Sequence, residues 1–340
     1  MSHHVIDVTL IGATHLAATE IISALAESSL EIGNLRLMDT PEQTGTLTEF
    51  RDRALVVSAV DPDLFRPREI IILTREVGDQ RHLVTAAVTA GARIIDCSGG
   101  MSLNPGVPLV TGGSDLALLP PDTRIAATPN PLAAVVSIGL KNLALRFGIK
   151  SITATILTGY AAAGRPAMDI LLEQTRSLLA FESLDHSDFS YQLAFNCISA
   201  RDTGEPVEWG FDGSRITAEL RRMLRDDRLP ISLAVMWVPV FMGMAVSCQV
   251  MLEAPADIAA IEAALTDAGC HVVSDFASFG ECSTQSALLA EEVRAGGITA
   301  APLGSDGARF WLTGDYFHVG LSGPALSLVR WFADRLGEEE

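Results

Sequence analysis

The stretch that decides the fold spans residues 5–18 and reads Val5-Ile6-Asp7-Val8-Thr9-Leu10-Ile11-Gly12-Ala13-Thr14-His15-Leu16-Ala17-Ala18. Its first seven residues are mostly apolar and β-branched, which is typical of a buried strand. Gly12 ends this run, and between residues 19 and 30 apolar residues recur at helical spacing. A strand, a glycine turn and a helix in this order predict the start of a parallel α/β sheet.

The following residues repeat this rhythm. We expect strands at 35–38, 69–74 and 93–96, and a helix at 82–90 that ends at Gly91, since glycine is favoured just past a helix C-terminus. Strands that alternate with helices predict a parallel sheet with right-handed crossovers.

The second half changes character and predicts an α+β unit. Its expected elements are a strand at 151–158, a helix at 167–180 that begins beside Pro166, strands around 235–240 and 246–250 joined through 241–243, a helix at 256–269, a strand at 271–273 and a last helix at 324–336. The uncharged run 229–252 is long enough to span a bilayer. Its two prolines and clustered β-branched residues favour two paired, buried strands instead.

Composition narrows the function classes. The chain has 340 residues, of which 48% are hydrophobic, so two domains with real cores are expected. Its net charge of −18 argues against nucleic acid and against an anionic membrane surface as partners. Five cysteines without a C-x-x-C pair, and no recognisable signal peptide, favour reduced thiols in the cytoplasm, with neither a disulfide framework nor a metal site.

The glycine turn is a candidate cofactor site formed by Gly12, Ala13, Thr14 and His15. A dinucleotide turn needs glycine at its second conserved position so that the pyrophosphate can approach the backbone, and here that position is His15. Two interpretations stay open at this point. The turn binds a dinucleotide through the helix N-terminus, or it is a structural turn that binds none.

Asp39 follows the second expected strand, 27 residues after Gly12, where an acidic residue would accept hydrogen bonds from ribose hydroxyls. The loop that follows it, Thr40-Pro41-Glu42-Gln43, carries no basic residue for a 2′-phosphate. If a dinucleotide binds, we therefore expect NAD rather than NADP. The alternative is that Asp39 only caps a turn.

Four later segments carry a family resemblance. They are Thr128-Pro129-Asn130-Pro131, the run Ile95-Asp96-Cys97-Ser98 that continues to Val110, Gln192-Leu193-Ala194-Phe195-Asn196, and Trp237-Val238-Pro239-Val240-Phe241-Met242-Gly243-Met244. Together they resemble the aspartate-semialdehyde dehydrogenase family, and most of all its Usg-type homologues that lack the catalytic cysteine.

The resemblance implies that the reactive positions are lost. The family's cysteine nucleophile falls on Pro131 and its acid–base histidine on Met244, and neither side chain can do that chemistry. The arginines that bind substrate phosphate and carboxylate fall on Ser102 and Trp237. No catalytic residue is therefore expected.

Four residues match the family's substrate pocket: Asn130, Gly164, Glu219 and Arg222. For Glu219 and Arg222 an ordinary pair on a helix surface is the alternative that we favour modestly.

The resemblance also implies architecture and function. We expect a Rossmann-type domain at 1–130, completed by the C-terminal helix at 322–340, and an α+β dimerisation domain at 131–321. The expected assembly is a homodimer, with a mixed dimer with an active dehydrogenase as a weaker idea. The expected function is that of a non-catalytic or ligand-binding homologue. The alternative is an active NAD-dependent oxidoreductase with rebuilt catalytic residues.

Overall fold

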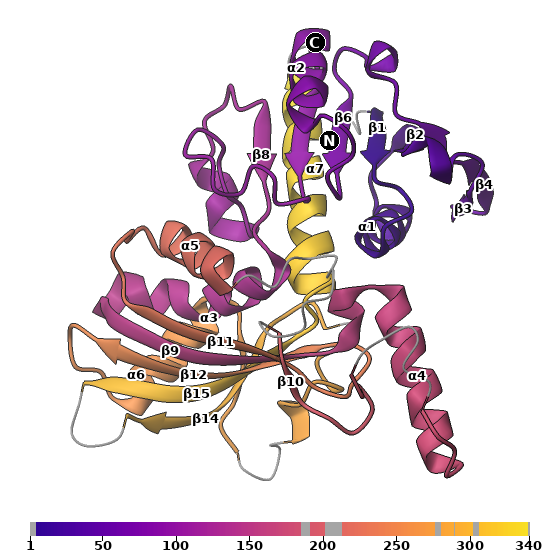
Figure 1. The fold of residues 1–340 in the computed structure, drawn as a ribbon. Helices are drawn as coiled ribbons and strands as arrows, with labels where there is room; N and C mark the ends of the chain where they lie inside the picture. The colour runs from indigo at the N-terminus through magenta and orange to yellow at the C-terminus, as the bar shows by residue number, and fades with distance from the viewer. Residues whose placement is uncertain are drawn as a thin grey trace. The chain divides into compact units, whose positions relative to one another are not determined.

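The computed structural model describes residues 5–184, 191–200, 213–275, 280–288, 290–301 and 306–338, without the side chain of Ser114. The chain divides into two compact units (Figure 1). The first comprises Met1–Pro131 and Gly320–Glu340, and the second comprises Leu132–Val319.

The first unit is built on a six-stranded sheet in the order β5-β2-β1-β6-β7-β8, with every neighbouring pair parallel. Its strands are β1 (Ile6–Ile11), β2 (Ile32–Asp39), β5 (Ser58–Ala59), β6 (Ile70–Leu73), β7 (Arg93–Asp96) and β8 (Ile125–Ala127). A separate hairpin pairs β3 (Leu47–Phe50) with β4 (Arg53–Val56). The predicted parallel sheet is confirmed.

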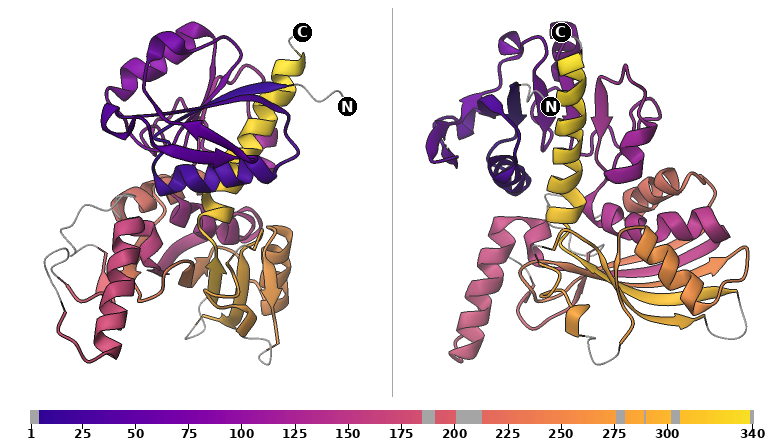
Figure 2. Two further views of the ribbon diagram at one scale, coloured as in Figure 1. Left: turned by 90° about the vertical axis from the view of Figure 1, so that its right-hand side faces the viewer. Right: turned by 180° about the vertical axis from the view of Figure 1, so that it is seen from behind.

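Three helices belong to this unit: α1 (Leu16–Glu27), α2 (Gln80–Ala90) and α7 (Gly323–Glu338). Helix α7, yellow in Figure 2, lies along the parallel strands and contacts β7. Helix α2 begins at Asp79, whose carboxylate accepts hydrogen bonds from two amides of the first turn, and it ends at Gly91 in the left-handed region, as predicted. The hydrophobic cluster between α2 and the sheet includes Ile71, Leu83 and Ile94.

The strand order of this sheet reverses at β1, because β2 lies on one side of β1 and β6 on the other. In open α/β sheets, ligands bind outside the carboxyl ends of the strands at such a switch point. Gly12 directly follows β1 at that edge, and Asp39 ends β2.

The second unit is built on a seven-stranded mixed sheet in the order β10-β11-β9-β12-β15-β14-β13. Its strands are β9 (Ile149–Thr158), β10 (Ile198–Ser199), β11 (Ile231–Trp237), β12 (Met244–Leu252), β13 (His271–Val273), β14 (Arg294–Ala300) and β15 (Gly307–Gly314). Its helices are α3 (Pro131–Phe147), α4 (Arg165–Leu179), α5 (Gly213–Leu224) and α6 (Ile258–Asp267). The predicted α+β class is confirmed.

The prediction that the two strands of the run 229–252 pair with each other is wrong. Strand β11 is parallel to β9, and β12 is antiparallel to β9, so β9 lies between them. Strand β11 also ends at Trp237, because the segment 238–243 leaves the sheet to meet the loop after β9, where Tyr160 N donates to Val240 O. In the part of the chain that the structure describes, no helix is long and apolar enough to cross a membrane.

Helix α3 packs closely on this sheet. A Cβ atom added to Gly139 of α3 would lie 2.7 Å from the side chain of Leu312 in β15, and one added to Gly314 would lie 3.1 Å from the side chain of Val135. The face of the sheet on which Gly314 lies is therefore the face covered by α3.

Candidate functional site

The carboxyl edge of the parallel sheet holds the first candidate site. Gly12 has a φ of +84°, and a Cβ atom there would lie 2.7 Å from Arg75 Cγ and from Thr74 Oγ1. Only glycine fits both the backbone conformation and the space. Arg75 follows β6, so its side chain crosses the end of β1 to reach Asp39 at the end of β2.

Asp39 is fully buried, and both of its carboxylate oxygens are occupied. Oδ2 accepts hydrogen bonds from the amide of Thr14 at 2.9 Å and from its hydroxyl at 2.7 Å. Oδ1 accepts from Thr40 N at 2.8 Å and from Arg75 Nη2 at 2.5 Å. Burial acts to raise the pKa of this carboxyl, but the hydrogen bonds from Arg75, Thr14 and Thr40 outweigh it and hold the pKa below its usual value.

His15 is the N-cap of α1. Its Nδ1 accepts a hydrogen bond from Ala17 N at 3.3 Å, and its side chain is only 6% exposed. Burial, and next the nearby Arg75 guanidinium, lower the pKa of His15 to about 4, although Asp39 acts in the opposite direction. The imidazole is therefore neutral at physiological pH, and it occupies a helix N-terminal donor that a phosphate would otherwise use.

The other backbone amides of this turn are also in use. Gly12 N and Ala13 N both donate to Met38 O, at 2.9 and 3.1 Å, and His15 N donates to Gly12 O at 3.0 Å. The amides of an anion-binding turn point at the ligand, whereas these point at protein acceptors. A phosphate would therefore find few free backbone donors here.

A pocket of about 360 Å³ opens beside Asp39. Its lining combines apolar side chains with three acidic ones. The lining residues are Asp39, Thr40, Pro41, Glu42, Val60, Pro62, Val77, Gly78, Asp79, His82 and Leu83. An apolar lining with a few polar groups is typical of sites for small ligands. The carboxylates of Asp39, Glu42 and Asp79 would repel an additional phosphate.

Two of the reactive positions named by the resemblance lie in or beside the first unit. Pro131 is buried at the start of α3, and a Cβ atom at Gly320 would stand 2.6 Å from its carbonyl oxygen, so the backbone is packed tightly against this position. Ser102 is also fully buried, and its hydroxyl donates to Gly99 O at 3.1 Å. This serine closes a turn of the backbone.

The other two reactive positions share one row of the large sheet. Trp237 of β11 and Met244 of β12 both pair with Thr158 of β9, and Met244 also pairs with Gly314. Residues directly opposite on neighbouring strands point to the same face. The row therefore faces α3, as Gly314 does.

This row is buried and apolar. Trp237 is 1% exposed and Met244 0%. The indole of Trp237 stacks on Tyr160 at a centroid distance of 5.2 Å and an interplanar angle of 9°. Thr158 Oγ1 and the Tyr160 hydroxyl are buried without a hydrogen-bond partner among the described residues. At the two positions where the resemblance places an arginine and a histidine, the row holds an aromatic stack and a thioether.

The predicted pocket remnants are placed as follows. Asn130 is buried beside Pro131, and Gly164 has a φ of +87° at the N-terminus of α4. The favoured prediction that Glu219 lies on a helix surface is wrong, because this residue is fully buried on α5. Its carboxylate accepts from Arg215 Nε at 3.3 Å. Burial lowers the pKa of Arg222, although Glu219 raises it.

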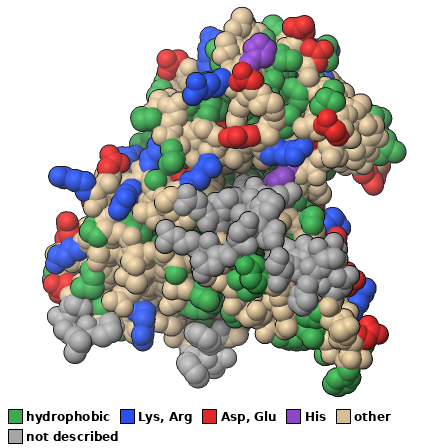
Figure 3. All heavy atoms as spheres, viewed as in Figure 1, with side chains coloured by type: hydrophobic (Ala, Val, Ile, Leu, Met, Phe, Trp, Pro, Cys, Tyr) green, Lys and Arg blue, Asp and Glu red, His purple; other side chains and the backbone are tan. Residues whose placement is uncertain are grey.

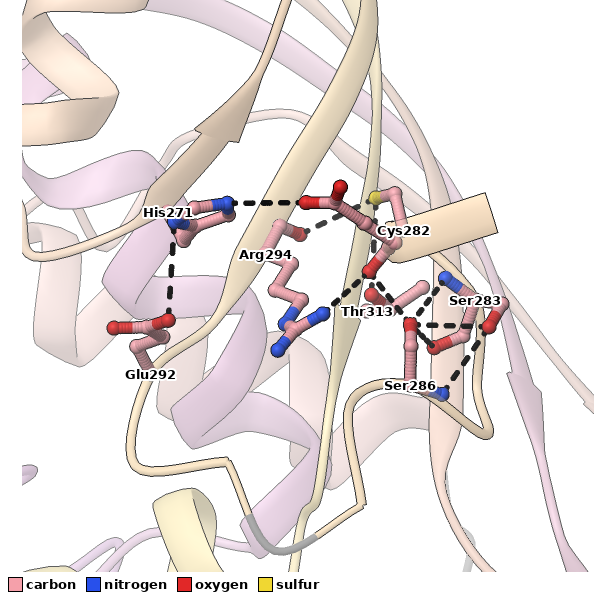
Figure 4. A network of polar contacts seen from close by, with 8 residues as sticks. His271, Cys282, Ser283, Ser286, Glu292, Arg294 and Thr313 are labelled. Carbon is pink, nitrogen blue, oxygen red and sulfur yellow. Dashed lines mark hydrogen bonds and ion pairs between the residues drawn. The ribbon is translucent and has the colours of Figure 1, made fainter. Parts of the chain in front are cut away.

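Four of the cysteines are buried thiols. Burial raises the pKa of the Cys97, Cys248 and Cys270 thiols to about 12, and burial also raises that of Cys282. Figure 4 shows Cys282, which lies in the chain between β13 and β14, in a polar network with neighbouring strands, and its Sγ lies 3.7 Å from Thr313 Oγ1 of β15. Such thiols are poor nucleophiles. Among the described residues, no group of three or more His, Cys, Asp or Glu side chains could hold a metal ion.

Sequence reasoning named Gly12, Thr14, His15 and Asp39, and the structure brings them together at one edge. Sequence reasoning missed Arg75, whose side chain passes Gly12 and pairs with Asp39. The available signal was an arginine directly after the isoleucine-rich strand at 69–74, which neighbours β1 in a doubly wound sheet.

Comparisons with known proteins agree with this geometry. Residues 7–113 match the family model described as "Semialdehyde dehydrogenase, NAD binding domain", and residues 140–316 match "Semialdehyde dehydrogenase, dimerisation domain". Aspartate-semialdehyde dehydrogenase of Rickettsia bellii is 24% identical over 317 residues, which cover 92% of this chain and 94% of that protein. The USG-1 protein homolog of Azotobacter vinelandii is 26% identical over 264 residues, which cover 76% of this chain and 78% of that protein.

A similar solved structure is that of aspartate semialdehyde dehydrogenase II from Vibrio cholerae. It superposes with a TM-score of 0.84 at 22% identity and covers 97% of this chain and 99% of that one. The strand orders of both units and the two family matches lead to one conclusion. The chain belongs to the semialdehyde dehydrogenase family.

Proposed function

We propose that this chain is a non-catalytic, ligand-binding member of the semialdehyde dehydrogenase family. The observation that carries the proposal is the buried row of the large sheet, which holds Trp237 and Met244 where the resemblance places the family's arginine and histidine. Neither side chain binds a carboxylate or exchanges a proton. Pro131 at the nucleophile position has no thiol. Loss of a nucleophile alone costs about a millionfold in turnover in a hydrolase.

The proposed ligand of the first unit is NAD, bound through its adenosine part. The match of residues 7–113 to an NAD-binding family model supports this choice. The pocket supports it too, because its apolar side chains suit the faces of adenine and Asp39 lies where ribose hydroxyls would be. Glu42 and Asp79 in the lining favour NAD over NADP, because they would repel a 2′-phosphate.

Two measurements test the proposal. The purified chain is assayed for oxidation of aspartate semialdehyde in the presence of phosphate with NAD or NADP, and the enzyme of Rickettsia bellii serves as the active control. Calorimetric titration with each cofactor is run alongside. We expect no turnover and tighter binding of NAD. Turnover near that of the control refutes the non-catalytic assignment, and tighter binding of NADP refutes the proposal that NAD is the ligand.

A second candidate function is an active NAD-dependent oxidoreductase that uses Cys197. This thiol is exposed, and it directly precedes β10, whose Ile198 pairs with Trp237. Its proximity adds to burial in raising the pKa of Tyr160. Turnover of any aldehyde that disappears in Cys197→Ser would establish this function in place of the first.

We also propose a cytoplasmic homodimer formed by the second unit. Support comes from the match to a dimerisation-domain model and from helix α4, which projects from the sheet in both views of Figure 2. Leu179 is 68% exposed at its end and Phe181 is 98% exposed just beyond, in the region where Figure 3 shows hydrophobic side chains at the tip of this helix. Such a surface is costly in a monomer. The cytoplasm suits the free thiols.

Light scattering at micromolar concentration tests the assembly. We expect a dimer for the wild-type chain and a weakened dimer for a Leu179→Glu, Phe181→Glu double variant. A monomeric wild-type chain would contradict the proposal. Glu27→Gln in the first unit is the control and should leave the mass unchanged.

A further inference from the structure

Arg75 is a feature of the first unit that the family resemblance did not anticipate. It follows β6, while its partner Asp39 ends β2, and β1 runs between these two strands. The arginine side chain therefore passes over Gly12, and its guanidinium closes the ribose end of the candidate site through the 2.5 Å bond to Asp39 Oδ1.

Ribose hydroxyls cannot simply add to Asp39, because a carboxylate has about four acceptor positions and these are all taken. Of the donors, the Thr14 and Thr40 amides are fixed by the turns in which they lie, and the Thr14 hydroxyl is held beside Asp39 Oδ2 by the same turn as its amide. The Arg75 guanidinium, by contrast, reaches Asp39 at the end of a long side chain that is 36% exposed. Of the four donors, it is therefore the one that can move furthest from Asp39.

The opposite end of the site is the N-terminus of α1, where a diphosphate would lie. The turn amides are occupied by protein acceptors, and the His15 imidazole is neutral and caps the helix. The Arg75 side chain passes Gly12, where an added Cβ atom would lie 2.7 Å from Arg75 Cγ, and Gly12 precedes the N-cap His15 in the same turn. The Nε of Arg75 is buried and has no acceptor among the described residues. A phosphate oxygen is the acceptor that a guanidinium favours.

We propose that Arg75 is an exchangeable ligand-binding residue. On binding, it leaves Asp39 to the ribose hydroxyls and moves its guanidinium to the diphosphate of the ligand. The ligand class that satisfies both ends is an adenosine 5′-diphosphate unit. This inference rests on the proposed NAD site and adds the residue that would hold the diphosphate in place of the turn that His15 caps.

The exchange predicts that loss of Arg75 changes the affinity for adenosine differently from the affinities for ADP and NAD. Without Arg75, adenosine meets no competitor for Asp39 and binds as tightly as before or more tightly. ADP and NAD lose a charge-assisted hydrogen bond at the diphosphate, so their affinities fall at least about tenfold relative to the affinity of adenosine. A merely structural role for Arg75 would change the affinities of all three ligands by a similar factor.

The experiment is calorimetric titration of adenosine, ADP and NAD into the wild-type chain and into Arg75→Met. Arg66→Met is the matched control, because Arg66 is exposed and its side chain pairs with Asp7, at the amino end of β1. We expect the ADP-to-adenosine affinity ratio to fall at least about tenfold only in Arg75→Met. An unchanged ratio overturns the inference while leaving the NAD site intact. If the wild-type chain binds none of the ligands, the proposal that NAD is the ligand is refuted as well.

Circular dichroism checks that Arg75→Met folds. If it does not, Arg75→Lys decides, because lysine keeps the charge and loses the forked geometry. An ADP-to-adenosine ratio between one and the wild-type value supports the exchange. A ratio equal to the wild-type value in Arg75→Lys, with all three affinities equally lowered, overturns it.

Discussion

The protonation of His15 gives the sharpest quantitative prediction for the first unit. The imidazole is buried, accepts a hydrogen bond from Ala17 N, and faces the Arg75 guanidinium and the Asp39 carboxylate. Burial and Arg75 lower its pKa from 6.5 to about 4. The perturbation is His15→Asn, since asparagine is a good N-cap that does not titrate.

The direction in which stability changes with pH depends on whether the folded or the unfolded chain binds the proton more tightly. Below pH 6.5 the unfolded chain protonates His15, while the folded chain does not until the pH approaches 4. The folded state is therefore at full stability above about pH 6.5 and loses stability as the pH falls towards 4. Each pH unit in this window costs about 1.4 kcal/mol, so the loss by pH 5 is about 2 kcal/mol.

The assay is urea unfolding of the wild-type chain and of His15→Asn at about pH 7.5 and about pH 5, followed by circular dichroism. Other titrating groups, such as the buried Glu69, contribute equally to both proteins and cancel in the double difference. We expect the wild-type chain to lose about 2 kcal/mol more than the variant. Equal losses in the two proteins would refute the claim that a buried, neutral imidazole caps α1.

Three further predictions concern Gly159 and two of the positions that the resemblance names as reactive. Gly159→Ala should lower the free energy of unfolding by about 2 kcal/mol or more, measured by chemical denaturation, because its Cβ would lie 2.9 Å from the backbone of Phe241. Trp237→Arg should destabilise the second unit by about 3 kcal/mol or more, since it buries a charge in the apolar row, and Trp237→Phe should cost less. Pro131→Cys should introduce a thiol without measurable turnover of aspartate semialdehyde, because Met244 still provides no base; appearance of turnover would show that the nucleophile alone was missing.

Local signals in the sequence were enough for the parallel sheet. The apolar run at 5–11, the glycine turn and the helical spacing after it depend on residues close in the chain, and the structure reproduces each one. Gly91 likewise ends α2 by a local rule. Where the backbone conformation depends on residues close in the chain, a single sequence is enough to predict it.

Pairing between distant segments was not predictable in this way. The run 229–252 shows two apolar strands, but nothing within it reveals that β9, about eighty residues earlier, lies between them. Glu219 was expected at a surface because its spacing to Arg222 is that of an exposed helix pair. Its burial depends on packing around α5, where Arg215 stabilises the carboxylate.

The candidate site shows the same division. Asp39 could be named from its place after the second strand, yet its state depends on Arg75, which lies on the far side of β1. A sequence shows which groups are available but not which are already paired. Because Asp39 and the turn amides are satisfied before any ligand arrives, binding must exchange interactions rather than fill vacancies. Exchange of one paired charge for another yields a small net free energy, so specificity in this site would come from ligands that satisfy both Asp39 and Arg75 at once.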